Sequence, residues 1–123
     1  MATIGHKAER KSLNQPEETR PFPKGHIELV NIGGVAMGRA TFEPGWKWSE
    51  CVKPIAKTSS CQAPHLGYVI SGQMKAVMDD GQEFTFGPGD AMSLPPGHDA
   101  WIVGNEKCVV IDIGGAGNYA KPT

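Results

Sequence analysis

Short runs in which apolar and polar residues alternate make up most of the chain from residue 26 onward. In residues 35–42, for example, Val35 and Met37 share one face while Ala40 and Phe42 share the other, which is the two-residue period of a β-strand. No segment of useful length shows the period of an amphipathic helix. The pattern therefore predicts an all-β chain, with strands at residues 27–32, 35–42, 65–70, 74–78, 83–86, 91–94, 100–103 and 108–113.

Turn-forming residues separate these runs. Asp79-Asp80-Gly81 lies between two predicted strands and is typical of a tight hairpin, because Asp and Gly tolerate positive φ angles. Glycine and proline mark further turns at residues 87–90 and 95–97, whereas residues 46–48 are expected to be extended and residues 53–60 to form a loop. About eight short strands joined in this way predict a β-sandwich or a β-barrel.

The length of 123 residues suits one domain with one hydrophobic core. Residues 1–25 are polar and of mixed charge, and their prolines interrupt any helix. We expect these residues to form an N-terminal arm that is flexible or forms an interface. The barrel is expected at residues 26–115 and a C-terminal tail at residues 116–123.

Charge and cysteine content limit the partners and the compartment. The formal net charge is −1, so there is no electrostatic reason to expect binding to nucleic acid or to a membrane surface. No apolar run approaches the roughly 20 residues needed to span a bilayer, and the first residues lack the apolar stretch of a secretion signal. Three cysteines without a CxxC spacing are typical of a reducing compartment. We expect a cytoplasmic protein with free thiols, the alternative being a bridge between Cys51 and Cys61.

Three segments in the second half of the chain form a recognisable set. Gly87-Pro88-Gly89-Asp90 is followed after four residues by Pro95-Pro96-Gly97, and Tyr68-Val69-Ile70-Ser71-Gly72-Gln73 lies upstream. These segments resemble the second motif and the end of the first motif of the cupin superfamily, and the hairpin at residues 79–81 lies between them as it does in that family. The resemblance covers residues 42–115. It implies a small single-domain cupin, whose fold is the double-stranded β-helix or jelly-roll barrel.

The resemblance also implies a metal site, here with altered ligand positions. By its spacing from the end of the first motif, His65 stands where the family usually has Glu. Cys61 and Ser59 stand at two positions that His usually occupies, and Ala100 stands at the position of the last His. His98 is two residues from Ala100, so strand alternation sends both side chains to the same face. We therefore take Cys61, His65 and His98 as candidate metal ligands.

The donor atoms of these three residues suit a divalent metal. A thiolate and two neutral imidazoles favour Zn²⁺, and three protein ligands leave one position for water or substrate. Fe²⁺ in oxygenases more often takes two His and a carboxylate, which Glu50 would supply if Cys61 were not a ligand. The resemblance admits Zn, Fe, Mn or Ni. The alternative is a metal-free pocket, in which Cys61 is a small buried hydrophobic residue and the histidines are hydrogen-bonded lining residues.

Four further residues are candidates for contact with a ligand. Trp46 and Trp48 share a face of the extended segment, and an indole stacks well on flat or aliphatic ligands. Their alternative role is packing against the N-terminal arm. Glu50 and Ser59 lie close in sequence to the candidate metal ligands, where polar groups would fix a hydroxyl or carboxyl group of a ligand.

These features favour a small polar molecule bound inside the barrel, and they leave the class of function open. The leading hypothesis is a metal-dependent enzyme of the dioxygenase, isomerase or lyase type. The alternative is a non-catalytic module that binds or senses a small molecule, which the loss of the family's Glu and last His favours. A third hypothesis is a structural partner subunit. Because homodimers are the commonest oligomers and the resemblance strengthens that expectation, we expect a homodimer.

Overall fold

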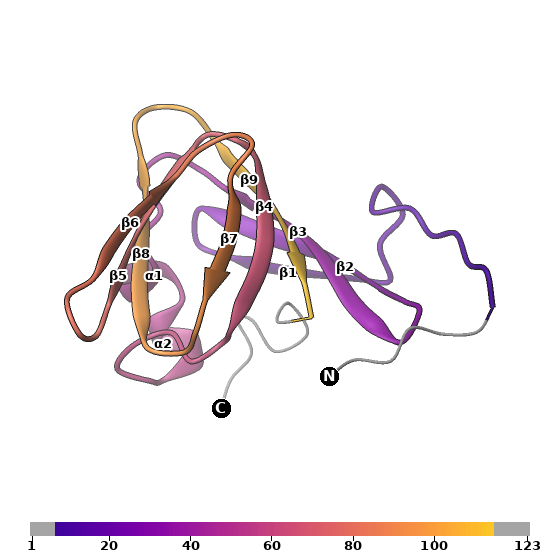
Figure 1. Ribbon diagram of the computed structural model, residues 1–123, viewed down its shortest axis with the longest axis horizontal. Coiled ribbons are helices and arrows are strands. Elements are labelled where there is room, and N and C mark those ends of the chain that lie inside the picture. The colour runs from indigo at the N-terminus through magenta and orange to yellow at the C-terminus, as the bar shows by residue number, and fades with distance from the viewer. Residues whose placement is uncertain (1–6, 115–123) are drawn as a thin grey trace.

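The computed structural model describes residues 7–114 and builds them mainly from β-strands (Figure 1). Each strand expected from the sequence is present, with its ends shifted by at most two residues. The prediction of an all-β chain is therefore confirmed. The strands are β1 (Glu18–Phe22), β2 (Gly25–Ile32), β3 (Val35–Phe42), β4 (His65–Ser71), β5 (Gln73–Met78), β6 (Glu83–Phe86), β7 (Ala91–Leu94), β8 (His98–Val103) and β9 (Cys108–Ile113).

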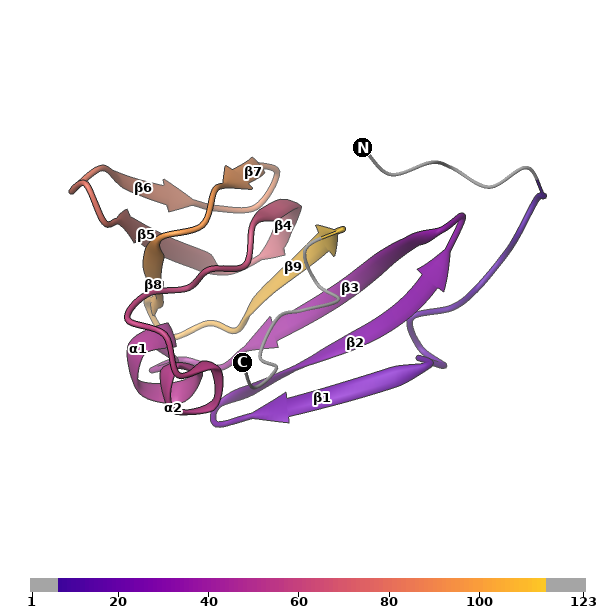
Figure 2. The ribbon, with the colours of Figure 1, turned by 90° about the horizontal axis from the view of Figure 1, so that it is seen from below.

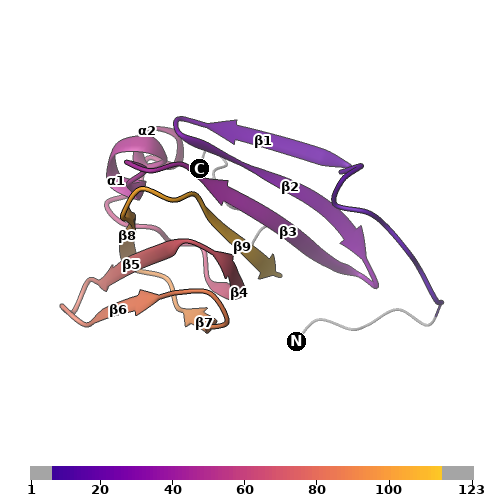
Figure 3. The same ribbon diagram turned by 90° about the horizontal axis from the view of Figure 1, so that it is seen from above.

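The strands form two antiparallel sheets that face each other. The larger sheet has the order β1-β2-β3-β9-β4-β7 and the smaller one has the order β6-β5-β8. Strand β9 lies between β3 and β4, so the end of the chain pairs with strands from its first half. Figures 2 and 3 show β5, β6 and β8 on one side of the barrel and the layer of β1, β2 and β3 on the other. This arrangement confirms the predicted jelly-roll barrel.

Alternation along the strands fills the barrel with apolar side chains. Val69 and Cys108 are fully buried between the sheets, as is Ala76. Burial of one large apolar side chain stabilises a fold by roughly 1.5–3 kcal/mol. At one end of the barrel, Phe42 packs against Trp46 with ring centroids 4.4 Å apart.

Part of the expected N-terminal arm belongs to the sheet. Residues 18–22 form β1, which pairs with β2 at the edge of the larger sheet. Charged residues and Pro21 interrupt the alternation of apolar and polar residues that would predict this strand. An edge strand nevertheless tolerates proline, because one of its sides has no neighbouring strand. These residues of the expected arm, which we took to be flexible or interface-forming, thus lie in an edge strand of the larger sheet. The wider division into arm, barrel and tail stays a prediction, and the tail at residues 116–123 lies outside the described residues.

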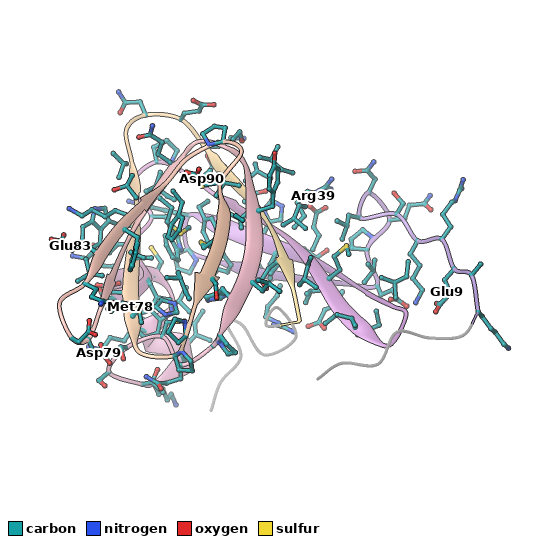
Figure 4. All side chains as sticks on the ribbon, viewed as in Figure 1. Glu9, Arg39, Met78, Asp79, Glu83 and Asp90 are labelled. Atoms are coloured by element: carbon teal, nitrogen blue, oxygen red, sulfur yellow. The ribbon has the colours of Figure 1, made fainter. Side chains whose placement is uncertain are left out.

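The segment that precedes β1 packs on the long β2–β3 hairpin of its own chain. The Arg39 guanidinium donates to the carbonyl oxygen of Leu13 at 3.2 Å and to Asn14 Oδ1 at 3.1 Å. Glu9 Oε1 accepts a hydrogen bond from the backbone amide of Gly33 at 3.1 Å. Figure 4 shows Arg39 on the side of the barrel that faces this segment, with Glu9 further out along it.

Two short helices correct the expectation for residues 46–60. The structure has α1 (Trp48–Cys51) and α2 (Lys53–Ala56), where the sequence predicts an extended segment and a loop. Each helix is a single turn, too short to show a helical period in the sequence. Both lie at one end of the barrel, near β8 (Figure 2). Cys51 and Cys61 are free thiols. In the described part of the chain, no helix is long and apolar enough to cross a membrane.

Candidate metal centre in the barrel interior

A small cavity lies between the two sheets. Its volume is about 30 Å³, which is room for roughly two water-sized molecules. Trp46 and Trp48 form part of its wall, and both are 2% exposed. Most of the other lining residues are apolar, and the polar ones are Cys61, His65, His98 and Asp112.

The structure brings together the three residues that the sequence singled out as metal ligands. One sulfur or nitrogen atom from each of Cys61, His65 and His98 lies within 4.8 Å of the other two. Cys61 Sγ is 3.7 Å from His65 Nε2. His65 is the first residue of β4 and His98 the first residue of β8, so each sheet contributes one imidazole. The backbone amide of Cys61 donates to the carbonyl oxygen of His98 at 2.7 Å and fixes the thiol beside the second imidazole.

Hydrogen bonds on the far side of each ring orient the two imidazoles. His65 Nδ1 donates to Asp112 Oδ2 at 2.6 Å, and His98 Nδ1 donates to the carbonyl oxygen of Pro95 at 2.9 Å. A carbonyl oxygen only accepts, so His98 must carry a proton on Nδ1. Nε2 of each ring is therefore the nitrogen left for a ligand, and Nε2 of His65 already faces Cys61. Partners of this kind commonly orient histidine ligands of metals.

The thiol and the nearer imidazole change each other's proton affinity. Burial raises the pKa of Cys61, but hydrogen bonds with His65 and His98 and the positive charges of these rings outweigh it and lower the pKa from 9.0 to about 6. Burial lowers the pKa of His65, while Asp112 and Cys61 raise it through hydrogen bonds and negative charge, to about 9. Without a metal, the pair is therefore a thiolate beside an imidazolium at neutral pH.

Asp112 is the polar residue of the cavity that the sequence analysis missed. It lies on β9 and is 5% exposed, and its Oδ1 has no hydrogen-bond partner among the described residues. The signal was present in the alternation of β9, because Cys108, Val110 and Asp112 share the inward face. An acidic residue at the third position of an otherwise apolar face indicates a specific partner, here His65.

Two of the predicted ligand-contacting residues lie outside the cavity. Glu50 lines a surface hollow with Lys47 and Trp101, and Ser59 lines another hollow beside α2. The chain turns into α1 and α2 between Trp46 and Cys61, and this turn carries both residues away from the interior. Ala100 does line the cavity together with His98, in agreement with the predicted alternation of that strand.

The fold and the cavity define a small β-barrel protein with a buried Cys/His/His donor set, and sequence comparison identifies its family. A family model described as "Cupin domain" matches residues 54–114, about half of the chain. The match includes all three candidate ligands and Asp112. Together with the jelly-roll fold, it shows that the chain belongs to the cupin superfamily. A search of curated proteins gives no significant match.

Solved structures with the same fold are distant in sequence. A protein of unknown function from Rhizobium leguminosarum is 17% identical, with a TM-score of 0.62 over 87% of this chain and 95% of that chain. The polyketide cyclase RemF from Streptomyces resistomycificus is 16% identical, with a TM-score of 0.60 over 87% of this chain and 78% of that chain. Oxalate decarboxylase from Bacillus subtilis is 19% identical, with a TM-score of 0.58 over 80% of this chain but 28% of that chain. At these identities the likeness shows the fold alone.

Proposed function

We propose that the barrel interior is a metal centre in which Cys61, His65 and His98 hold a divalent metal, Zn²⁺ in preference to Fe, Mn or Ni. The observation that carries this proposal is the convergence of three donor atoms within 4.8 Å in an otherwise apolar cavity. Burying polar side chains among apolar ones is costly unless they have partners. A metal would be such a partner for all three at once.

The donor set fits this metal. Thiolate sulfur and imidazole nitrogen are the ligands that zinc takes most often, and three protein ligands leave the fourth position free. Bond lengths of about 2.0–2.3 Å place the ligands of a tetrahedral zinc about 3.5 Å apart, close to the 3.7 Å between Cys61 Sγ and His65 Nε2. A zinc ion bound there would polarise a carbonyl group or lower the pKa of a water molecule.

The protein's own residues prepare this site for a small polar molecule. Asp112 holds His65 and the carbonyl of Pro95 holds His98, so neither ring needs to reorient on binding. The surrounding apolar wall, which includes Trp48, lowers the local polarity and so strengthens polar interactions inside. Asp112 Oδ1, which has no partner among the described residues, is an acceptor that would take a hydrogen-bond donor of the bound molecule.

The proposal includes metal-dependent enzyme activity of the dioxygenase, isomerase or lyase type. Two structural neighbours are named as enzymes, an oxalate decarboxylase and a polyketide cyclase, so the same fold carries catalysis in other proteins. The shared fold does not select a reaction, because function resides in the site and not in the fold. The volume of about 30 Å³ favours a substrate whose reacting part has only a few non-hydrogen atoms.

A second candidate is a metal-free module that binds or senses a small molecule. The contacts among Cys61, His65 and Asp112 favour it, because thiolate, imidazolium and carboxylate already stabilise one another without a metal. In this case the thiolate itself would be the reactive or ligand-binding group.

Metal analysis of untagged protein tests the first candidate. We expect close to one equivalent of metal per chain in the natural protein. His65→Ala and His98→Ala should each lose most of it, whereas His26→Ala, which changes a histidine of β2 outside the cavity, should keep it. Circular dichroism confirms that each variant is folded. Metal-free natural protein that binds no added Zn²⁺ or Co²⁺ would exclude the metal centre.

A thiolate titration of chelator-treated protein tests the second candidate. Because the pKa of Cys61 is lowered to about 6, its thiolate should be present above that pH and should disappear as the pH falls below it. The absorbance at 240 nm should therefore change with a midpoint near pH 6 in the natural protein and not in Cys61→Ser. Cys108 serves as an internal contrast, since burial raises its pKa to about 11. If this midpoint is found and no metal binds, the metal-free module is the better account.

A further inference from the structure

Three side chains of the cavity, Cys61, His65 and Asp112, contact one another in the order of a nucleophile, a base and a group that orients the base. Cys61 Sγ is 3.7 Å from His65 Nε2, and His65 Nδ1 donates to Asp112 Oδ2 at 2.6 Å. Because Nδ1 keeps its proton for Asp112, Nε2 is the nitrogen that can take the proton of the thiol. This arrangement activates a cysteine or serine side chain as a nucleophile.

The fold holds these three groups in place from separate elements. His65 begins β4, and Asp112 lies beside Gly67 on the neighbouring strand β9, so the two side chains are diagonal neighbours on the inward face. Cys61 precedes β4, and its backbone amide is bonded to the carbonyl oxygen of His98 at the start of β8. Cys61 is 3% exposed and Asp112 is 5% exposed. The contacts therefore belong to the packed interior and not to mobile surface side chains.

We propose that Cys61 is a site of oxidation by a small hydroperoxide, with His65 as the base that takes the thiol proton and passes it to the leaving oxygen. The product is the sulfenic acid of Cys61. The proposal rests on the metal-free candidate for the function of this site, because a metal ion would occupy the sulfur atom and the Nε2 atom that the reaction needs.

The reaction balances with the hydroperoxide as its only co-reactant. The sulfur atom of Cys61 attacks one peroxide oxygen, and an S–O bond forms as the O–O bond breaks. Sulfur is oxidised by one electron pair, which the leaving oxygen receives. The thiol proton moves to His65 Nε2 and then to that oxygen, which departs as water when the oxidant is hydrogen peroxide. Asp112 stabilises the positive charge that His65 carries between these two steps.

The size of the cavity favours a small peroxide over larger electrophiles. The volume of about 30 Å³ gives room for roughly two water-sized molecules, and hydrogen peroxide contains two oxygen atoms. His98 Nδ1 donates to the carbonyl oxygen of Pro95, so its Nε2 is an acceptor for an O–H group of the peroxide. An acyl group with its leaving group is larger than this space, which argues against acyl transfer at the same thiol.

The other sulfur atoms near the site provide internal comparisons. Cys51 and Cys108 are free and buried, but neither lines the cavity, so no second described thiol lies there to convert the sulfenic acid into a disulfide. Met74 and Met92 do line the cavity, and methionine is also oxidised by peroxides. Oxidation of these two methionines therefore reports whether peroxide enters the cavity.

Peptide mass spectrometry of chelator-treated protein exposed to hydrogen peroxide tests the proposal. We expect Cys61 to gain oxygen before Met74 and Met92. His65→Ala should slow the oxidation of Cys61 at least about 100-fold, as is usual when a general base is lost, without slowing that of the methionines. The matched control is His26→Ala, which changes a histidine of β2 that does not line the cavity and should leave the rate unchanged. Circular dichroism confirms that both variants are folded.

Three outcomes would overturn the proposal. Oxidised Met74 and Met92 beside an unreacted Cys61 would mean that peroxide enters but the thiol is not activated. No oxidation of any of the three would mean that peroxide does not reach the cavity. Equal rates for Cys61 in His65→Ala and His26→Ala would mean that His65 takes no part.

A comparison of two peroxides tests the same site without a substitution. The rate of Cys61 oxidation by hydrogen peroxide, divided by the rate with tert-butyl hydroperoxide, should exceed the same ratio for free cysteine at least about 10-fold, because the extra methyl groups overfill the cavity. A ratio equal to that of free cysteine would mean that Cys61 reacts outside the cavity and would contradict the proposal.

Metal analysis separates this proposal from the metal centre. A protein that binds no Zn²⁺ but is oxidised rapidly at Cys61 supports the hydroperoxide reaction alone. A protein that binds Zn²⁺ but leaves Cys61 unoxidised after removal of the metal supports the metal centre and contradicts the hydroperoxide reaction. If both hold, Zn²⁺ should slow the oxidation of Cys61, because metal and peroxide compete for the same sulfur atom.

Discussion

At the scale of single residues, Asp112 determines how the candidate ligands are presented. Its Oδ2 is 2.6 Å from His65 Nδ1, and both side chains are almost fully buried. The carboxylate therefore fixes the proton of His65 on the side away from the cavity and leaves Nε2 toward Cys61. His98 is oriented by a neutral carbonyl oxygen, that of Pro95, whereas Asp112 places a carboxylate on Nδ1 of His65.

Asp112→Asn should weaken metal binding, because the amide keeps the shape of the side chain but removes its charge. We expect the dissociation constant for Zn²⁺ to rise about 10–100-fold, as is usual when the partner of a histidine ligand is lost. A competition titration with a chelator measures this change. The control is Asp99→Asn, since Asp99 accepts from the backbone amides of Ser49 and Ala100 and does not line the cavity. Equal dissociation constants for Zn²⁺ in both variants would show that Asp112 does not contribute to metal binding.

The sequence could locate the ligands better than their surroundings. His65 follows from its spacing to the Tyr-Val-Ile-Ser-Gly segment, and His98 follows from strand alternation, because both depend on regular strands. Glu50 and Ser59 could not be placed in the same way, since their positions depend on two single-turn helices. Asp112 was open to prediction from the alternation of β9, but no spacing motif draws attention to it.

At the scale of elements, the turn between β4 and β5 sets how closely β9 approaches. Gly72 has a φ angle of +75°, and a Cβ atom there would lie 2.3 Å from the carbonyl oxygen of Lys107 and 2.6 Å from Cys108 Cα. The turn thus needs glycine both for its conformation and for the space that the start of β9 occupies. This contact lies next to the β4–β9 pairing that brings Asp112 to the same end of β4 as His65.

Gly72→Ala should lower the free energy of unfolding by about 2–4 kcal/mol, the sum of a strained φ and a backbone clash. Gly104→Ala separates the two causes, because Gly104 has a φ of +86° but nothing lies within 4 Å of an added Cβ. That variant should lose only about 1–2 kcal/mol. Urea denaturation followed by tryptophan fluorescence measures both values. Similar losses would show that the clash is relieved by a small movement of β9.

Among the secondary-structure elements, the long central strands could be predicted from the sequence pattern, whereas the edge strand and the two helices could not. Strands β3 and β9 were predictable because they alternate over six or more residues in the middle of a sheet. Strand β1 was not, because an edge strand with one free side can carry charges and a proline. The helices α1 and α2 were missed because four residues are too few for a period of 3.6.

At the scale of the whole molecule, the candidate ligands connect the two sheets. His65 belongs to the larger sheet and His98 to the smaller one. The backbone amide of Cys61 is hydrogen-bonded to the carbonyl oxygen of His98. A ligand held by all three would therefore join the two halves of the barrel at the end where β4 and β8 begin. Unfolding separates the sheets and must release such a ligand, so binding and global stability are linked.

Zn²⁺ should accordingly raise the melting temperature of chelator-treated protein. At a free concentration 100 times the dissociation constant, the gain in stability is about 2.7 kcal/mol, which corresponds to an increase in Tm of about 10 °C for a chain of this size. Differential scanning calorimetry measures the shift. Mg²⁺ should have no such effect, because it prefers oxygen ligands. Cys61→Ser should lose most of the increase in Tm that Zn²⁺ causes, because the serine hydroxyl is a poor zinc ligand. The variant should still unfold cooperatively, since serine is nearly the same size as cysteine. An equal increase in Tm in the natural protein and in Cys61→Ser would mean that zinc binds elsewhere on the chain. The two sheets would then be joined by the apolar core alone.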